Sequence, residues 1–328
     1  MKNNFFISVV IPTYNRSKYL LKILDILKSN SINFHRFEVI ICDSFSKDHT
    51  KNKINTFKSF YKNINIKYLN LNKNIHSIKR NTGILEAKGR YIVFLDDDCF
   101  PEKTFLRDYY KIFSNYKNKN NIYCGSVDYQ KEIKKNNFLK YRKTRHFILK
   151  TNQKIFQNNL QPSKIVTMNM GFENSYKILK TKLFNKNFNS YGFEDYEFGY
   201  RLSKKGFNLK ACGVLVEHND LRGFYLYLNK IRFLGYQSMK YLVNINYDAA
   251  KNNNFFILEN NFIIKFLLNF YFFEFLLNSF IKFSIFFEKK LFYFPLVYKT
   301  GIAAAYLLGC IDRQHYLKGN IRFKKWYI

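Results

Sequence analysis

The stretch RYIVFLDDDCF at residues 90–100 decides the fold class, because it joins an apolar strand to three adjacent carboxylates. Its run of apolar residues predicts a strand that is buried on both faces of a sheet. Similar runs precede it at residues 5–11, where Pro12 is expected to end the strand, and at 37–42 and 64–69. Amphipathic helical patterns separate these runs, at residues 18–28, 48–61 and 75–87. Strands that alternate with helices indicate an α/β fold with a mostly parallel sheet.

Polar side chains follow these strands, and ligands of such sheets bind beyond the carboxyl ends of the strands. The residues expected at this edge are Thr13, Tyr14, Arg16, Asp43, Asp96, Asp97 and Asp98. Three adjacent carboxylates repel one another when ionised, and a divalent cation relieves that repulsion. Carboxylate oxygens favour Mg²⁺ or Mn²⁺. Taken alone, such a triplet is more often an exposed acidic turn than a metal site.

The composition is strongly basic, with 55 Lys and Arg against 23 Asp and Glu and a formal net charge of +32. An apolar content of 47% supplies a packed core and excludes global disorder. The charge suggests an anionic partner, such as a membrane surface, a nucleic acid or a phosphorylated substrate. Lys, Asn, Ile, Phe and Tyr are all abundant, so compositional drift explains part of the charge equally well.

The five cysteines are scattered and form no C-x-x-C pair, which excludes a zinc ribbon and a thioredoxin-like motif. A reducing cytosol suits this pattern best. The apolar run at residues 5–11 is too short for a signal peptide and lacks a cleavage pattern. The uncharged stretch at residues 300–311 is shorter than the roughly 18 apolar residues of a spanning helix, so we expect none.

Five motifs in order resemble those of the family 2 glycosyltransferases, which are nucleotide-sugar enzymes with the GT-A fold. They are SVVIPTYNR at 8–16, EVIICD at 38–43, RNTG at 80–83 followed by AKG at 87–89, the Asp-x-Asp pair Asp96 and Asp98, and GFEDYEFGYRL at 192–202. The last segment is similar to that of galactosyl- and chondroitin-type transferases. The resemblance spans about residues 5–220. Ser44 and Phe45 depart from it, because the family usually has Asp and Gly there.

The resemblance implies a role for each residue at the strand ends. Asp98 would coordinate Mn²⁺ or Mg²⁺, Asp96 would serve the ribose or the water shell of the metal, and His218 would complete the metal site. Asp43 would accept a hydrogen bond from uracil. The other residues that would line the nucleotide site are Thr13, Tyr14, Arg16, Arg80 and Asp97. Guanidinium groups also pair well with the oxygens of a diphosphate.

Glu194 and Asp195 are the candidate acceptor-side carboxylates. A carboxylate within reach of the acceptor hydroxyl can act as general base, which we assign to Asp195, and Glu194 would bind acceptor hydroxyls. Acidic residues also suit the first turn of a helix for purely structural reasons. The resemblance implies an inverting transfer from a nucleotide-diphosphate sugar, expected to be a UDP-sugar, to a glycan or lipid-linked acceptor in cell-surface polysaccharide synthesis.

Two other functions compete with this one: a basic nucleic-acid-binding protein and a degenerate transferase that only binds nucleotide sugar. No helix-turn-helix, zinc-finger or aromatic sheet signature is present, so we expect no nucleic-acid partner. The intact Asp98 and Asp195 argue against the degenerate transferase.

We expect a catalytic domain at residues 1–225, with a nucleotide-sugar half at 1–110 and an acceptor half at 111–225. Residues 226–328 form a helical tail rich in aromatic residues and lysine, in which the pattern over 261–289 favours two broken helices over one straight helix. The tail is either a cap on the catalytic domain or a set of interfacial helices. In the second case it would hold a cytoplasmic enzyme on the anionic inner face of the cell membrane.

Overall fold

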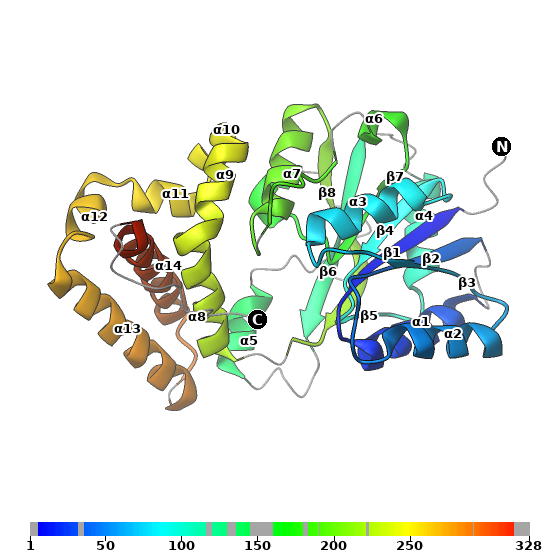
Figure 1. Cartoon of the computed structure of the whole chain (residues 1–328), viewed down its shortest axis with the longest axis horizontal. Helices are drawn as coiled ribbons and strands as arrows, with labels where there is room; N and C mark the ends of the chain where they lie inside the picture. The colour runs from blue at the N-terminus through cyan, green and yellow to red at the C-terminus, as the bar shows by residue number, and fades with distance from the viewer. Residues whose placement is uncertain are drawn as a thin grey trace. The chain divides into compact units, whose positions relative to one another are not determined.

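The computed structural model describes residues 6–31, 36–115, 120–129, 136–144, 160–179, 183–189, 191–220, 223–290 and 292–317. The chain divides into two compact units, both drawn in Figure 1. The first comprises Met1–Gln130, Arg145–Lys186 and Phe198–Asp220, and the second comprises Lys131–Thr144, Asn187–Glu197 and Leu221–Ile328.

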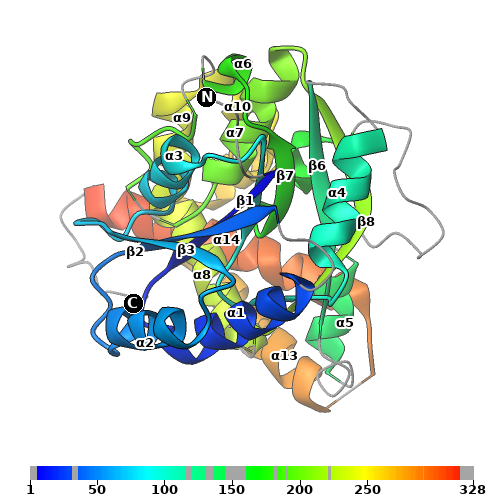
Figure 2. The same cartoon turned by 90° about the vertical axis from the view of Figure 1, so that its right-hand side faces the viewer.

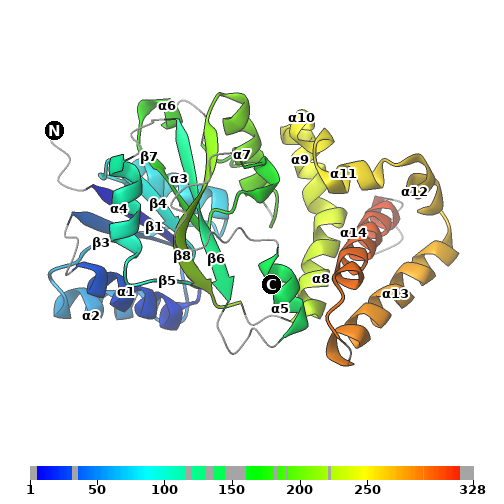
Figure 3. The same cartoon turned by 180° about the vertical axis from the view of Figure 1, so that it is seen from behind.

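The first unit is built on an 8-stranded sheet with the order β3-β2-β1-β4-β7-β6-β8-β5. Its strands are β1 (Ile7–Thr13), β2 (Phe37–Asp43), β3 (Asn65–Asn70), β4 (Tyr91–Leu95), β5 (Cys99–Pro101), β6 (Asn121–Tyr129), β7 (Asn169–Glu173) and β8 (Asn208–His218). The β1–β2, β2–β3, β1–β4 and β6–β8 pairs are parallel. The three pairs β4–β7, β6–β7 and β5–β8 are antiparallel. The expected mostly parallel sheet is therefore confirmed, and Figure 3 shows β6 and β8 side by side.

Helices cover both faces of this sheet, as Figure 2 shows for α1 and α2 on one side and α3 on the other. They are α1 (Ser17–Ser31), α2 (Thr50–Phe60), α3 (His76–Glu86), α4 (Phe105–Asn115), α6 (Tyr176–Leu179) and α7 (Glu194–Lys204), with a short 3₁₀ turn, η2 (Pro162–Lys164). Val9 packs in one hydrophobic cluster with residues of α1, α2 and α4. Val10 packs in the other cluster, with Ile84 of α3 and Phe198 of α7. Burial on both faces explains why the strands are continuously apolar.

All strands and helices expected in the first hundred residues are present, with ends that differ by a few residues. The expectation that Pro12 ends the first strand is wrong, because β1 continues through Pro12 to Thr13. Pro12 lies opposite Cys42 of β2, whereas the pairing of β1 with β4 already stops at Val10. Proline has no backbone N–H to donate. Pro12 therefore lies in the part of β1 that pairs with β2 and no longer with β4.

The second unit is helical. Its elements are α5 (Asn137–Lys143), α8 (Phe224–Phe233), the π-helical turn η3 (Leu234–Ser238), α9 (Met239–Ile245), α10 (Tyr247–Lys251), α11 (Asn254–Glu259), α12 (Phe262–Leu267), α13 (Tyr271–Lys290) and α14 (Pro295–Leu317). The break between α12 and α13 confirms the broken helix expected there. Among the described residues, none of the helices is both long enough and apolar enough to cross a membrane.

Helix α14 packs against α8, η3 and α13. Glycines allow the closest approach: a Cβ at Gly309 would lie 1.9 Å from the carbonyl oxygen of Arg232, and one at Gly235 would lie 2.1 Å from that of Tyr306. Arg232 also donates to both carboxylate oxygens of Asp312, at 2.5 and 2.7 Å. Backbone contact and a two-pronged ion pair therefore hold α8 and η3 against α14.

Candidate active site

The loops that follow β1 and β2 are hydrogen-bonded to each other. Asn15, in the left-handed conformation with φ 52°, donates its backbone N–H to Ser46 Oγ at 2.7 Å. Its side-chain oxygen accepts from the backbone N–H of Lys47 at 2.7 Å. Ser17 donates its backbone N–H to Asp48 at 2.8 Å. These bonds hold the segment that carries Thr13, Tyr14 and Arg16 at the edge of the sheet.

Asp43 ends β2 and is buried. Its carboxylate accepts from Ser46 Oγ at 2.5 Å, from the backbone N–H of Ser46 at 3.2 Å and from the hydroxyl of Tyr68. An ionised carboxylate offers about four lone-pair positions, so roughly one remains for a ligand. Asp43 thus holds its own loop while it stays able to accept one further hydrogen bond.

Two arginines form ion pairs with the three carboxylates after β4. Arg16 forms ion pairs with Asp97, at 3.1 Å, and with Asp98. Arg80, which is buried on α3, forms an ion pair with Asp96 at 3.2 Å. Thr13 Oγ donates to Asp97 at 2.8 Å. The structure therefore brings Thr13, Arg16 and Arg80 together at the carboxylate triplet.

The buried carboxylates of the triplet differ in their pKa values. Burial raises the pKa of Asp97 to about 7, against the opposing effect of Arg16. Burial also opposes ionisation of Asp98, but His218 and Arg16 together outweigh it and hold the pKa of Asp98 well below its ordinary value. Asp98 is therefore the carboxylate of this buried pair that keeps its negative charge.

His218 reaches this cluster from the end of β8, because β5 and β8 pair with Cys99 opposite His218. Its Nε2 lies 3.4 Å from Asp98 Oδ1. The possible ligand atoms of Asp98, Cys99 and His218 all lie within 4.8 Å of one another. The Nδ1 of His218 is buried and has no hydrogen-bond partner among the described residues.

The donor set fits a divalent cation such as Mn²⁺. A charged carboxylate and an imidazole are suitable ligands for that ion. Burial raises the pKa of the Cys99 thiol well above its ordinary value, so a thiolate ligand is not expected there. The residues that would hold the metal are therefore Asp98 and His218, with Asp96 on the same turn.

Lys79 is a residue of this edge that sequence reasoning missed. It is almost fully buried, and its ammonium donates to the carbonyl oxygen of Thr13 at 3.1 Å and to Asn74 Oδ1 at 2.7 Å. Burial lowers its pKa to about 8, although Asp97 and Asp43 favour the charged form. Little in the sequence indicates that Lys79 is buried. It directly precedes Arg80 in an amphipathic helix, and a lysine in such a helix normally faces solvent.

Glu194 and Asp195 open helix α7 and belong to the second unit, whereas the carboxylate triplet belongs to the first. Gly192 just before them has φ 102°, and a Cβ there would lie 2.3 Å from Leu234. Tyr196 donates to the carbonyl oxygen of Ala249 at 2.9 Å. These contacts fix the first turn of α7 on the helices that follow Gly223.

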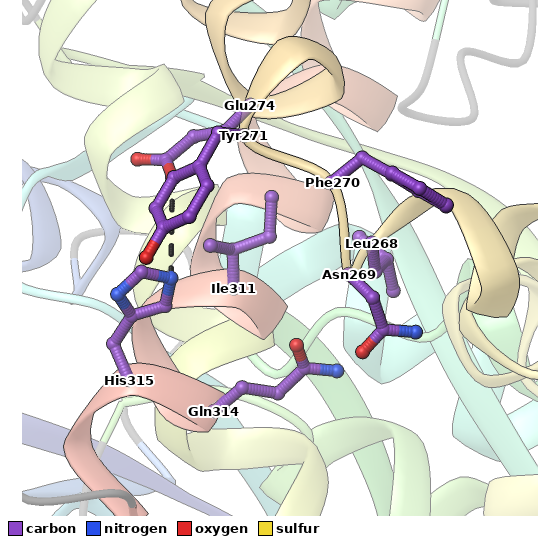
Figure 4. Close-up of a pocket in the computed structure, with 8 residues that line it drawn as sticks. All are labelled: Leu268, Asn269, Phe270, Tyr271, Glu274, Ile311, Gln314 and His315. Atoms are coloured by element: carbon purple, nitrogen blue, oxygen red, sulfur yellow. Dashed lines mark ion pairs between the residues drawn. The ribbon is translucent and has the colours of Figure 1, made fainter.

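A pocket of about 180 Å³ lies in the second unit, at the junction of α12 and α13. Figure 4 shows its lining, which comprises Leu268, Asn269, Phe270, Tyr271, Glu274, Ile311, Gln314 and His315. The lining includes a carboxylate and has neither lysine nor arginine, so its charge does not suit a nucleotide diphosphate. The strand ends of the first unit remain the better donor site.

The comparison with known families agrees with this geometry. The profile described as glycosyl transferase family 2 matches residues 8–179, which contain β1, β2, α3 and the carboxylate triplet. The chain belongs to glycosyl transferase family 2.

Two relatives illustrate how far the sequence similarity extends. The glycosyltransferase AglE of Haloferax volcanii is 34% identical over 101 residues, which cover 31% of this chain and 33% of AglE. The chondroitin synthase of Escherichia coli is 26% identical over 248 residues, which cover 66% of this chain and 35% of the synthase. The chain thus spans about a third of the length of each.

Solved structures of glycosyltransferases share the fold. The S. aureus TarS fragment 1–349 in complex with UDP superposes with a TM-score of 0.52 at 15% identity, covering 96% of this chain and 92% of that one. The mannosyltransferase PcManGT of Pyrobaculum calidifontis, in complex with GDP-Man and Mn²⁺, superposes with a TM-score of 0.59 at 15% identity, covering 95% and 87%. This likeness confirms the GT-A fold.

Proposed function

We propose that this family 2 glycosyltransferase is a metal-dependent, inverting enzyme. It transfers a sugar from a UDP-sugar to a hydroxyl group of a glycan or lipid-linked acceptor during the synthesis of a cell-surface polysaccharide. The observation that carries the proposal is the cluster at the ends of β1, β4 and β8, where Arg16, Asp98 and His218 meet. A nucleic-acid binder does not explain this cluster, and a degenerate transferase that only binds nucleotide sugar does not explain the intact acceptor-side carboxylate Asp195.

The donor side is assigned to the first unit. Asp43 has about one lone-pair position left and would accept the N3–H of a uracil ring. Tyr14 and Thr13 would line the nucleotide beside it, and Asp96 and Asp97 would face the ribose. The TarS structure contains UDP, which favours uracil as the base, whereas GDP-Man in PcManGT shows that the fold also accommodates guanine.

Asp98 and His218 would hold Mn²⁺ or Mg²⁺, which as a Lewis acid stabilises the charge on the departing diphosphate. Arg80 is buried against Asp96, so its guanidinium is already oriented at the sheet edge. Arg16 pairs with both Asp97 and Asp98. When the donor binds, the guanidinium of Arg16 would donate some of its hydrogen bonds to the phosphate oxygens instead. Both arginines would thereby bind the leaving group.

The acceptor side is assigned to the start of α7. Asp195 would take the proton of the attacking hydroxyl, and Glu194 would bind neighbouring hydroxyl groups of the acceptor. The attacking oxygen forms its bond to the anomeric carbon as the bond to the diphosphate breaks on the opposite face. A single displacement of this kind inverts the anomeric configuration, and it requires no enzyme nucleophile.

We propose that the enzyme acts on the cytoplasmic, inner face of the cell membrane, where a lipid-linked acceptor is available. Relatives of the chain include poly(ribitol-phosphate) transferases and a chondroitin synthase, which are enzymes named for a polymer that they act on or make. The high positive charge of the chain suits an anionic lipid surface.

The proposed function is tested by incubating the full chain with a panel of nucleotide sugars and measuring nucleotide release with and without Mn²⁺. Slow hydrolysis of one UDP-sugar, which increases when the correct acceptor is added, is the expected result. The configuration of the product is then read by NMR. Retention of the anomeric configuration would exclude the single displacement, and no turnover of any donor together with tight, salt-sensitive binding of RNA or DNA would favour the nucleic-acid binder.

A further inference from the structure

Helix α13 in the second unit has apolar side chains on two of its sides. Leu277, Ser284 and Phe287 are buried, and a Cβ at Gly301 of α14 would lie 3.1 Å from Ser284 Oγ, so this face packs on α14. A second side of the helix carries aromatic and aliphatic side chains that are exposed. They are Phe272, Phe275, Leu276, Phe283 and Phe286. A helix that lies on a protein surface in water normally has a polar outer face.

The exposed apolar residues of α13 form a stripe that is interrupted by the exposed Ser279. Its apolar residues recur at intervals of three, four and seven positions, which places them on one side of a helix. From Phe272 to Phe286 the stripe is about 21 Å long at 1.5 Å per residue. Phe272, Phe275 and Phe286 are 70%, 65% and 58% exposed. Side chains as large as these, gathered in one place and uncovered, mark a surface that contacts a partner.

The preceding segment enlarges this surface. Phe262, Ile263 and Phe266 of α12 are exposed, as are Phe270 and Tyr271 at the start of α13. We call the exposed apolar residues of α12 and α13, from 262 to 286, the aromatic face. Figure 1 shows these two helices following each other along the second unit.

The charges around the aromatic face have one sign. Among the described side chains from Asn254 to Leu317, every exposed charged residue is a lysine: Lys265, Lys282, Lys289 and Lys299. The acidic residues of the same stretch are only partly exposed. Glu259 pairs with Arg313, Glu274 lies 3.9 Å from His315, and Asp312 pairs with Arg232. The outward charge is therefore positive, while several of the carboxylates are directed toward partners inside the unit.

We infer that the aromatic face inserts into the interfacial region of a bilayer that contains anionic lipid, with the lysines at the level of the headgroups. Apolar side chains flanked by lysines are the pattern of helices that lie in the plane of a membrane interface. Lysine also extends its charged end to water while its methylene chain stays in apolar surroundings. The aromatic face belongs to the second unit and the proposed donor site to the first, and insertion into a bilayer does not depend on which sugar is transferred.

Charge decides between a bilayer and a second copy of the chain. Two copies that meet through the aromatic face would bring their exposed lysines together without exposed carboxylates from α11–α14 to pair them. The formal charge of +32 on each chain adds to that repulsion. An anionic lipid surface supplies the opposite charge and an apolar medium at the same time.

The test is sedimentation of the full chain with vesicles of phosphatidylcholine and phosphatidylglycerol, compared with vesicles of pure phosphatidylcholine. Binding is expected on the mixed vesicles, and it should weaken but persist at high salt because the aromatic insertion is insensitive to screening. The variant Phe272→Ser/Phe275→Ser/Phe286→Ser should lose at least about tenfold in vesicle affinity. Lys282→Gln/Lys289→Gln should lose roughly fivefold per lysine on mixed vesicles only.

The matched control is Phe60→Ser/Leu85→Ser, which removes exposed apolar side chains from α2 and α3 of the first unit. It should bind vesicles as the unaltered chain does. UDP binding and the melting temperature are measured on each variant. They distinguish a variant that has lost only the membrane-binding side chains from one that no longer folds. Unchanged vesicle binding of the folded triple variant would overturn the inference, and so would sedimentation equilibrium that shows a dimer which the triple variant dissociates.

Discussion

His218 Nε2 lies 3.4 Å from Asp98 Oδ1, because the antiparallel pairing of β5 with β8 places His218 opposite Cys99. The carboxylate that follows β4 and the imidazole that ends β8 thus come together from distant parts of the sequence. The pair is buried, and Arg16 compensates its charge. A cation bound there would find one charged oxygen ligand and one nitrogen ligand already oriented.

The first prediction concerns this pair. His218→Gln should weaken Mn²⁺ binding in the presence of UDP by at least about tenfold, because it removes the nitrogen ligand from the site. Electron paramagnetic resonance of free Mn²⁺ measures the affinity directly. Cys99→Ala is the matched control, since the buried neutral thiol of Cys99 is not expected to be a ligand. If the cysteine variant loses the metal and the histidine variant keeps it, the ligand assignment is wrong.

Removal of the metal should stop the reaction. Excess chelator is expected to abolish UDP release, and Mn²⁺ or Mg²⁺ should restore it. Asp98→Asn removes one negative charge from the metal site and should raise the KM for the donor by about tenfold or more, a loss of roughly 1.4 kcal/mol. Asp25→Asn, on an exposed carboxylate of α1, should behave as the unaltered enzyme. Full activity in chelator would contradict metal dependence.

Asp195→Asn tests the general base. The substitution should lower kcat by about 10²–10⁴ and leave UDP affinity nearly unchanged, because the proposed donor contacts all come from the first unit. Steady-state kinetics and calorimetric titration with UDP provide the two measurements. A variant with normal kcat would remove Asp195 from the mechanism, whereas a variant that no longer binds UDP would assign it to the donor side.

Lys79 predicts a pH dependence of stability. Its pKa of about 8 lies below the ordinary 10.5, so between these values the unfolded chain binds a proton that the folded chain has released. The free energy of unfolding contributed by Lys79 therefore rises with pH across this window, and the full cost of burying the charge applies below pH 8.

Lys79→Met removes that titration. The difference in unfolding free energy between the variant and the unaltered chain should shift by up to about 3 kcal/mol, in favour of the unaltered chain, as the pH rises through the window. Urea denaturation at several pH values measures the difference, which also removes the contribution of titrating groups that do not interact with Lys79. A difference that stays constant with pH would mean that Lys79 does not titrate in this range.

Gly309 tests the packing of α14. Gly309→Ala should destabilise the chain by about 1–3 kcal/mol or more, because the added Cβ meets the carbonyl oxygen of Arg232 rather than a movable side chain. Thermal unfolding measures the effect. Gly223→Ala is the matched control, since no atom lies within 4 Å of a Cβ at Gly223. Equal stability of the two variants would show that α8 and α14 move apart without cost.

The residues of the proposed donor site could be named from the sequence because they follow strands whose apolar runs are unambiguous. Asp43, Asp96 and Asp98 needed only the rule that parallel strands present their carboxyl ends at one edge. Strand β6 is not among the strands that the apolar runs predict, because it lies within a segment rich in lysine and arginine. Its burial comes from neighbours β7 and β8, which are distant in sequence.

The sequence by itself determined the alternation of strands and helices, the polar residues at the strand ends and a break in the helix within residues 261–289, because each depends on short-range periodicity and on the chemistry of adjacent residues. The tertiary structure alone decided which groups meet. It paired Arg16 with Asp97 and Asp98, buried Lys79 beneath Thr13, and brought His218 to Asp98. It also decided which apolar face of α13 packs on α14 and which stays exposed. Long-range strand pairing and helix packing create these contacts, and local pattern carries no information about partners far along the chain.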